Sequence, residues 1–370
     1  MTGDSDNILR NIRPGKIILP MIIGLGVVGY MIWDEYRPGT FDDLNFSAGV
    51  LVFLFVAVLM MITRDLGYMI RVRILAGREI TWKKSFNIVM LWEFTSAITP
   101  SVIGGTSVAI YFVHKEGMNV GKSTAVVMAT SFLDEMYFIL MFPLMFLVVS
   151  GTDLFTIGAD QAAGEALSFT NKYFYFAVIG YSFKFCWVLL MGWALFVNPT
   201  AVKRFLLFIF RFRWIRRWRG GVEKMGNDMI ESSAELKHKP FLFWIKAFLA
   251  TFFSWSARYW IVNFLLLALI FGRPGQASDM LYSFAEHILI FARQLVMWIM
   301  MLVMPTPGGS GFAEAVFKEY MAEFIRVEGF GSMMAFLWRL VTYYPYLVIG
   351  AIIVPRWVKR ILGREKAVVL

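Results

Sequence analysis

The feature that most constrains this chain is a series of long apolar runs, each close to the length needed to cross a lipid bilayer. A spanning helix needs about 20 mostly apolar residues, and helices satisfy their own backbone hydrogen bonds in lipid. Full crossings are predicted at residues 17–33, 47–62, 123–149, 173–197, 241–271, 281–304 and 333–354. The sequence therefore predicts an all-α polytopic membrane protein, with about seven full transmembrane helices in a single integral membrane domain over residues 1–370.

Composition agrees with this class and excludes others. The chain is 58% hydrophobic and 17% charged, whereas soluble domains are about 45–50% apolar and about 25% charged. The net charge is +10, but the basic residues lie between apolar runs, which favours the positive-inside rule over a nucleic-acid partner. With one cysteine and three histidines without metal-ligand spacing, we expect no disulfide, metal or cofactor.

The charges of the connecting segments predict the orientation. The acidic segments 34–45 and 151–172 are expected outside, and the basic segments 64–84 and 198–239 and the tail after Pro355 inside. Both termini are then expected on the cytoplasmic side of a plasma (inner) membrane. The first apolar run has no small-residue cleavage site after it, so it is expected to be a retained helix. Segment 198–239 is either an amphipathic stretch lying on anionic headgroups or an ordinary basic loop.

Two apolar stretches are interrupted, and the number of crossings indicates how they run. Stretch 86–113 must enter and leave on the inner side, turning at 99–105, because an odd number of crossings separates residue 84 from residue 151. By the same count, stretches 281–304 and 308–325 return to the outside through a turn at 305–311. Residues 86–149 and 281–354 then form two inverted-topology repeats, each a broken hairpin plus a helix. Chance is the alternative, since Thr, Pro and Gly are common in turns.

Residues 117–123 resemble a Walker A loop, but Glu116 stands where that motif needs glycine. No strand is expected before it, so ATP binding is not predicted.

Ionisable residues at membrane depth are the strongest functional signal, since each costs at least ~2.5 kcal/mol at the bilayer centre. The acidic ones are Glu93, Asp134, Glu135, Glu286 and Glu314, and the others are Lys184, Arg258, Arg293, Arg339 and His287.

Roles follow from the chemistry of these groups. An arginine fork suits phosphate, so Arg258, Arg293 and Arg339 are the predicted phosphate ligands. Glu93, Asp134, Glu135 and Glu314 would bind a cationic headgroup or carry a coupling proton. Static ion pairs are the alternative, for example Arg258 with Asp134 or Glu135, and Lys184 would then snorkel. Helix N-termini at the two turns would add a positive dipole end; the turn residues assigned to substrate binding are Thr99, Pro100, Gly104, Gly105, Pro307, Gly308, Gly309 and Gly311.

Both turns also resemble family signatures. Ile98-Thr99-Pro100, Gly104-Gly105, Tyr111, Gly117 and Lys122 resemble the first signature of the lysylphosphatidylglycerol-synthase transmembrane family. Residues 305–314, with Pro-Gly-Gly-x-Gly followed by Glu314, resemble the second, and Arg339 with Tyr343, Tyr344 and Pro345 resembles the pattern in the last helix. The resemblance covers residues 17–354. It implies a relation to the flippase half of the multiple peptide resistance factor, without that protein's soluble aminoacyl-transferase domain.

The resemblance and the charges together favour a lipid flippase, not an enzyme. Its substrate would be an aminoacyl-phospholipid, an anionic phospholipid or a polyprenyl phosphate, and its partners membrane lipids. A membrane-embedded enzyme using Asp134, Glu135 or His287 to modify a lipid headgroup is the second reading. An accessory partner of a glycosyltransferase is the third, and a second copy of the chain or a neighbouring transferase is a candidate protein partner.

Overall fold

The computed structural model is a helical bundle, and no strand occurs among the residues it describes, which are 22, 25–26, 29–36, 38, 42, 44–99, 102–157, 167–169, 171–212, 216–273, 281–301, 309 and 311–369. Five helical segments within this part of the chain are long and apolar enough to span a membrane. They are α3 (Ala48–Leu75), α6 (Val120–Val148), α8 (Lys172–Phe196), α11 (Phe241–Phe271) and the segment Gly331–Ile361. The all-α membrane class is therefore confirmed. The predicted run 17–33 lies mostly outside the described residues, and the count of seven stays a prediction.

The longest helices form the centre of the bundle. α3 and α11 pack along each other, and they approach closely at Gly67, where a Cβ would lie 2.9 Å from the carbonyl oxygen of Ala250. Small residues allow such close helix packing in membranes. The residues on this contact, including Ala57 and Ala247, are fully buried.

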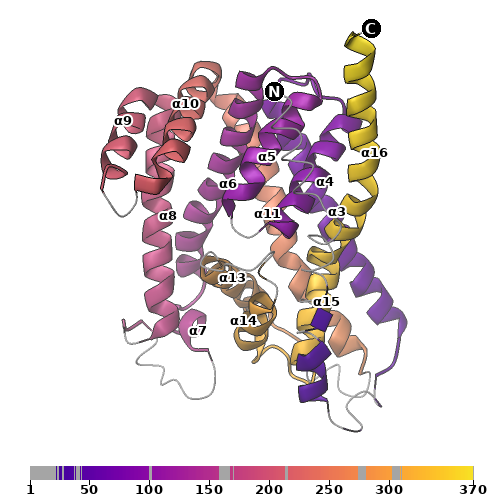
Figure 1. Cartoon of the computed structure of the whole chain (residues 1–370). Coiled ribbons are helices and arrows are strands. Elements are labelled where there is room, and N and C mark those ends of the chain that lie inside the picture. Colours follow the sequence, from indigo (N-terminus) through magenta and orange to yellow (C-terminus); the bar gives the residue numbers. More distant parts are fainter. Residues whose placement is uncertain are drawn as a thin grey trace.

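Shorter helices fill the two ends of the bundle. Helices α4 (Trp82–Ile98) and α5 (Val102–Lys115) lie in the upper half of Figure 1, at the end that carries α9 (Pro199–Ile209) and α10 (Arg219–Leu236). Helices α13 (Phe284–Met301) and α14 (Phe312–Met321) lie in the lower half, near α7 (Gly151–Phe155). Each pair is in contact, α4 with α5 and α13 with α14. The pairs thus enter from opposite ends, an arrangement compatible with the predicted inverted repeats.

Three predicted boundaries are wrong. The segment 64–84 was expected to be an inner loop, but α3 continues to Leu75, because Arg64 and Arg71 find acidic partners on neighbouring helices. The turn expected at 99–105 is shorter, since Gly104 and Gly105 already belong to α5. The residues after Pro355 were expected to be non-helical, but they belong to α16 (Tyr344–Val369).

The last predicted span, 333–354, is broken instead of continuous. Helix α15 (Gly331–Thr342) ends at Tyr343, which has φ −131° and ψ −56°, and α16 begins at the next residue. Pro345 has no N–H to donate to the preceding turn and its ring clashes with a helical carbonyl, so it is best accommodated in the first turn of a new helix.

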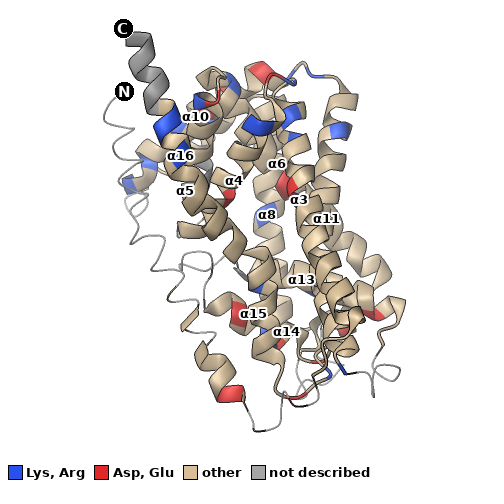
Figure 2. Cartoon of the chain, turned by 90° about the vertical axis from the view of Figure 1, so that its right-hand side faces the viewer, with Lys and Arg blue, Asp and Glu red and all other residues tan. Residues whose placement is uncertain are grey.

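Basic residues gather around the end that carries α9 and α10, and isolated charged residues also occur midway along the helices (Figure 2). An η2 turn (Arg216–Trp218) connects α9 and α10.

Candidate functional site

A group of charged side chains lies at the middle of the bundle, and we call it the central charge cluster. It begins with two arginines on α3, Arg64 and Arg71, which are only 4% and 1% exposed. They are about two helical turns apart and so lie on the same face. The members of the cluster are Arg64, Asp65, Arg71, Glu93, Asp134, Glu135, Lys184 and Arg258.

Arg64 joins α3 to α4 and α16. Its guanidinium forms an ion pair with Glu93 of α4, and it donates hydrogen bonds to Asp65 at 2.8 Å and to the Tyr346 hydroxyl at 2.9 Å. Tyr346 in turn donates to Asp65 at 2.6 Å. The Ser254 hydroxyl of α11 donates to the Arg64 carbonyl at 2.8 Å, which fixes this part of α3 against α11.

Arg71 joins α3 to α6 and α11. Both terminal nitrogens of its guanidinium face the two oxygens of Asp134, and one also donates to the Thr251 hydroxyl at 3.1 Å. The Trp255 indole N–H donates to Asp134 at 2.5 Å. A bidentate, charge-assisted pair of this kind is both strong and directional.

Glu135, the neighbour of Asp134, has a separate partner. The Lys184 ammonium of α8 forms an ion pair with Glu135 and lies 3.8 Å from the centroid of the Trp298 ring. Lys184 is 4% exposed, so it is held inside the bundle and does not snorkel to the membrane surface.

The acids of the cluster are more accessible than the cations that pair with them. The side chains of Asp65, Glu93, Asp134 and Glu135 are 16–23% exposed, whereas those of Arg64, Arg71 and Lys184 are 2–6% exposed. The carboxylates are therefore partly accessible to a small polar group, whereas the cations paired with them are buried deeper in the bundle.

Arg258 differs from the other cations. It is half-buried on α11 and lies over the Trp255 ring at 5.7 Å, and its charge acts on the Tyr346 phenol. Within the part of the chain that the structure describes, no ion pair or hydrogen bond holds its guanidinium. The predicted pairing of Arg258 with Asp134 or Glu135 is wrong, because Arg71 and Lys184 occupy those carboxylates.

The other two predicted phosphate ligands lie elsewhere and are engaged. Arg293 donates to the backbone carbonyls of Asp153, Thr156 and Tyr320 and to the Glu323 carboxylate. It connects α13 to α7 and α14, which is a structural arrangement.

Arg339 forms a buried pair with Glu314 of α14 at 2.8 Å and lies over the Tyr343 ring at 4.1 Å. The second oxygen of Glu314 accepts from the backbone N–H of Gly311 at 2.7 Å. Gly311 has φ 89° and Gly309 has φ 68°, a region that glycine adopts readily. Glu314 and Arg339 therefore stabilise the turn that begins α14.

The remaining predicted turn residues are only partly described. The Thr99 hydroxyl donates to the Thr95 carbonyl at 2.8 Å, so it closes the end of α4. Pro100, Pro307 and Gly308 lie outside the described residues. Glu286 pairs with Arg326, and His287 contacts the Asn263 side chain at 2.7 Å, both outside the central charge cluster.

Sequence reasoning missed Arg64, Asp65, Arg71 and Tyr346. The two arginines were assigned to an inner loop because positive charge usually marks one. Their spacing, with apolar residues continuing to Leu75, was the signal that the helix goes on. Among the described residues, no group of three His, Cys, Asp or Glu side chains is placed to hold a metal ion.

Comparison with known proteins places this bundle in a family. The family model described as "Lysylphosphatidylglycerol synthase TM region" matches residues 17–350. A relative named "UPF0104 membrane protein", from Archaeoglobus fulgidus, is 30% identical over 310 residues, covering 81% of this chain and 84% of the relative. No solved structure matches the chain. The chain is therefore a member of the family defined by the transmembrane region of lysylphosphatidylglycerol synthase.

Proposed function

We propose that this protein is a lipid translocator that moves a phosphate-bearing lipid between the two leaflets of a membrane. The observation that carries the proposal is the half-buried Arg258, which has no ion-pair partner among the described residues and lies over Trp255, the ring that donates to Asp134. A lipid headgroup that crosses a bilayer needs a polar binding site of this kind within the membrane, because desolvated charges are costly in hydrocarbon.

Charge balance supports Arg258 as the phosphate ligand. Among the described residues of the cluster, the four acids Asp65, Glu93, Asp134 and Glu135 face three cations that are paired with them. Arg258 supplies a fourth positive charge near the group without being committed to any one carboxylate. Its planar fork can therefore accept a phosphate in bidentate geometry.

The accessible carboxylates supply the second half of the proposed site. When a phosphate neutralises Arg258, the four acids exceed the three remaining cations. The excess negative charge favours either an amino group on the same headgroup or a proton taken up by one carboxylate. The family membership makes a lipid the natural substrate class.

Helices α4–α5 and α13–α14 would close the path from opposite ends. Each pair reaches into the bundle from one end only (Figure 1), as do the broken helices of transporters that alternate access around a fixed midplane site. In this proposal the protein acts without chemical conversion of the lipid, in a cell membrane with both termini on the basic, inner side.

The proposal is tested by lipid exchange in proteoliposomes. Fluorescent phosphatidylglycerol, lysyl-phosphatidylglycerol and polyprenyl phosphate are compared, with leaflet location read by an impermeant quencher. We expect Arg258→Gln to slow exchange of the substrate lipid about ten- to a hundredfold, the effect of losing a hydrogen bond to a charged group. The control is Lys246→Gln, on the same helix but exposed, which should exchange at the parent rate.

Two outcomes would count against the proposal. Equal lipid-exchange rates in Arg258→Gln and Lys246→Gln would show that Arg258 does not bind the lipid during exchange. Binding of a lipid without exchange would instead favour a headgroup-modifying enzyme or an accessory partner of a transferase.

A further inference from the structure

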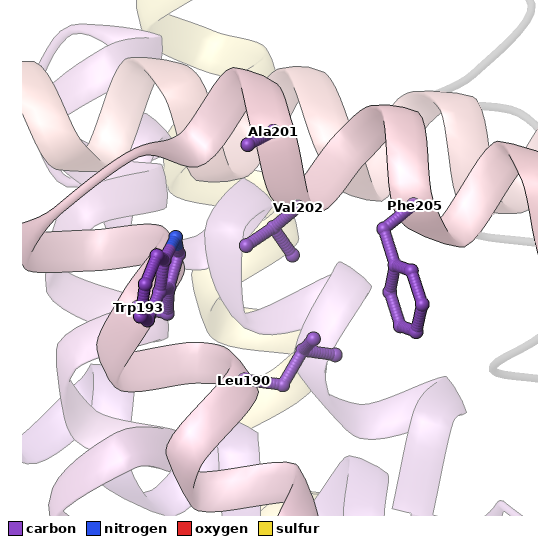
Figure 3. A pocket seen from close by; sticks show the side chains of 5 residues that line it. All are labelled: Leu190, Trp193, Ala201, Val202 and Phe205. Atoms are coloured by element: carbon purple, nitrogen blue, oxygen red, sulfur yellow. The ribbon is translucent and has the colours of Figure 1, made fainter.

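A second feature that could face lipid lies at the basic end of the molecule, where α8 meets α9. The side chains of Leu190 and Trp193 on α8 and of Ala201, Val202 and Phe205 on α9 line a notch of about 210 Å³ (Figure 3). Its lining is apolar except for the indole nitrogen of Trp193. The notch opens outward from the bundle, since Trp193 is 55% and Phe205 53% exposed.

Helix α9 has two apolar faces, which is unusual for a helix at a water-facing surface. Val202 and Leu206 are buried on one face, where α9 contacts α8 and α10. Phe205 and Phe208 are exposed on another, and Phe212 is exposed just beyond the end of the helix. Exposed aromatic rings on an amphipathic helix with basic neighbours are typical of a helix that lies in the plane of the membrane interface.

Cationic side chains border the same face. Arg204 is exposed and lies three residues after Ala201, so it is adjacent to the notch on the helix surface. Lys203 donates a hydrogen bond to Asn227 of α10 at 2.6 Å, whereas Arg204 has no ion-pair or hydrogen-bond partner among the described residues. Exposed Arg211, Arg216 and Arg217 continue the positive surface.

We propose that the α8–α9 notch binds an anionic phospholipid of the leaflet that it faces, with one acyl chain in the notch and the lipid phosphate on Arg204. The apolar lining is suited to the acyl chain of the lipid, and the positive charge at the rim is suited to its phosphate. The site is separate from the translocation path and does not depend on the proposed transport function. Its occupant is a resident lipid that anchors α9 to the membrane surface.

The test places a reporter beside the notch. In a Cys186→Ala background, Val197→Cys carries a bimane label, because Val197 is 56% exposed and lies one turn after Trp193. The protein is placed in nanodiscs of phosphatidylcholine containing equal mole fractions of either brominated phosphatidylglycerol or brominated phosphatidylcholine. Bromine on the acyl chain quenches the label on contact.

We expect brominated phosphatidylglycerol to quench more strongly, and Arg204→Gln to reduce this preference about fivefold, the effect of one basic side chain at an anionic surface. Lys237→Gln removes an exposed charge at the same end of the molecule but away from the notch, and it should leave the preference unchanged. Ala201→Trp fills the notch and should lower quenching by both lipids.

Equal quenching by the two lipids in the parent protein would overturn the proposal and leave only non-selective boundary lipid. An equal effect of Arg204→Gln and Lys237→Gln would also overturn it, because the preference would then come from overall charge. Thermal unfolding midpoints of the variants check that each remains folded, and the Arg204→Gln comparison stands even if Ala201→Trp does not fold.

Discussion

At the scale of single residues, the fully buried charged side chains in the described part of the chain are each tied to a specific partner. Glu314 is fully buried and Arg339 is 6% exposed, and their side chains meet at 2.8 Å. An ion pair of this kind adds little net stability over an apolar pair, but removing one partner leaves the other charged and unsatisfied. Removing one of the two residues should therefore destabilise the protein more than replacing both of them.

This dependence predicts the behaviour of single and double variants. Arg339→Met or Glu314→Gln alone should lower the free energy of unfolding by about 3–5 kcal/mol, and the double variant should recover much of the loss. Unfolding by denaturant in mixed micelles measures both. The control is Lys172→Gln, whose partner Glu319 is largely exposed, with an expected loss under about 1 kcal/mol. Additive losses in the double variant would contradict the interpretation.

The sequence located the acids of the central charge cluster better than its cations. Glu93, Asp134 and Glu135 stand alone in apolar runs, so their cost in lipid makes them conspicuous. Arg64 and Arg71 lie near a helix end with other basic residues, where positive charge is ordinary. Which carboxylate pairs with which cation depends on helix packing, so the Arg71–Asp134 and Lys184–Glu135 pairs could not be derived from spacing alone.

At the scale of elements, helix boundaries follow local chemistry where no tertiary partner intervenes. The predicted run 241–271 coincides with α11, since the preceding Pro240 and the following Gly272 are both helix-boundary residues. α3 was predicted too short, because its last turns depend on partners from α4, α6 and α11. To predict the break at Tyr343, Pro345 would have had to be interpreted as part of the first turn of a new helix.

The contact between α3 and α11 gives a prediction at this scale. Gly67→Leu should force the helices apart, because even a Cβ would meet the Ala250 carbonyl oxygen at 2.9 Å. The expected loss is about 1–3 kcal/mol, the usual cost of overpacking. Gly220→Leu is the control, since a Cβ there has nothing within 4 Å. Thermal unfolding in detergent compares the two variants, and equal midpoints would show that α3 and α11 can separate freely.

At the scale of the whole molecule, charge is distributed unequally between the ends. Basic side chains surround the end with α9 and α10 (Figure 2), while α7 and α14, which carry Asp153, Glu314 and Glu319, lie towards the other end (Figure 1). The positive-inside rule then predicts that α9 and α10 lie on the cytoplasmic side.

This orientation is testable with single cysteines in the Cys186→Ala background. Glu328→Cys, at an exposed position, should react with an impermeant thiol reagent on intact cells. Lys237→Cys, also exposed, should react only after the membrane is permeabilised. The reverse pattern would invert the whole topology, and reaction of both on intact cells would indicate mixed insertion.

The pairing of Arg64 and Arg71 also bears on how the chain is made. Synthesis proceeds from the N-terminus, so α3 emerges before Glu93, Asp134 and Thr251, the residues that later satisfy its arginines. Each arginine costs about 2.5–3.5 kcal/mol at the centre of the lipid, so while α3 is alone its arginine-bearing half is expected to stay near the bilayer surface. Burial of that half therefore has to wait for α4, α6 and α11. The charges that hold the finished bundle together thus set the order in which it can be assembled.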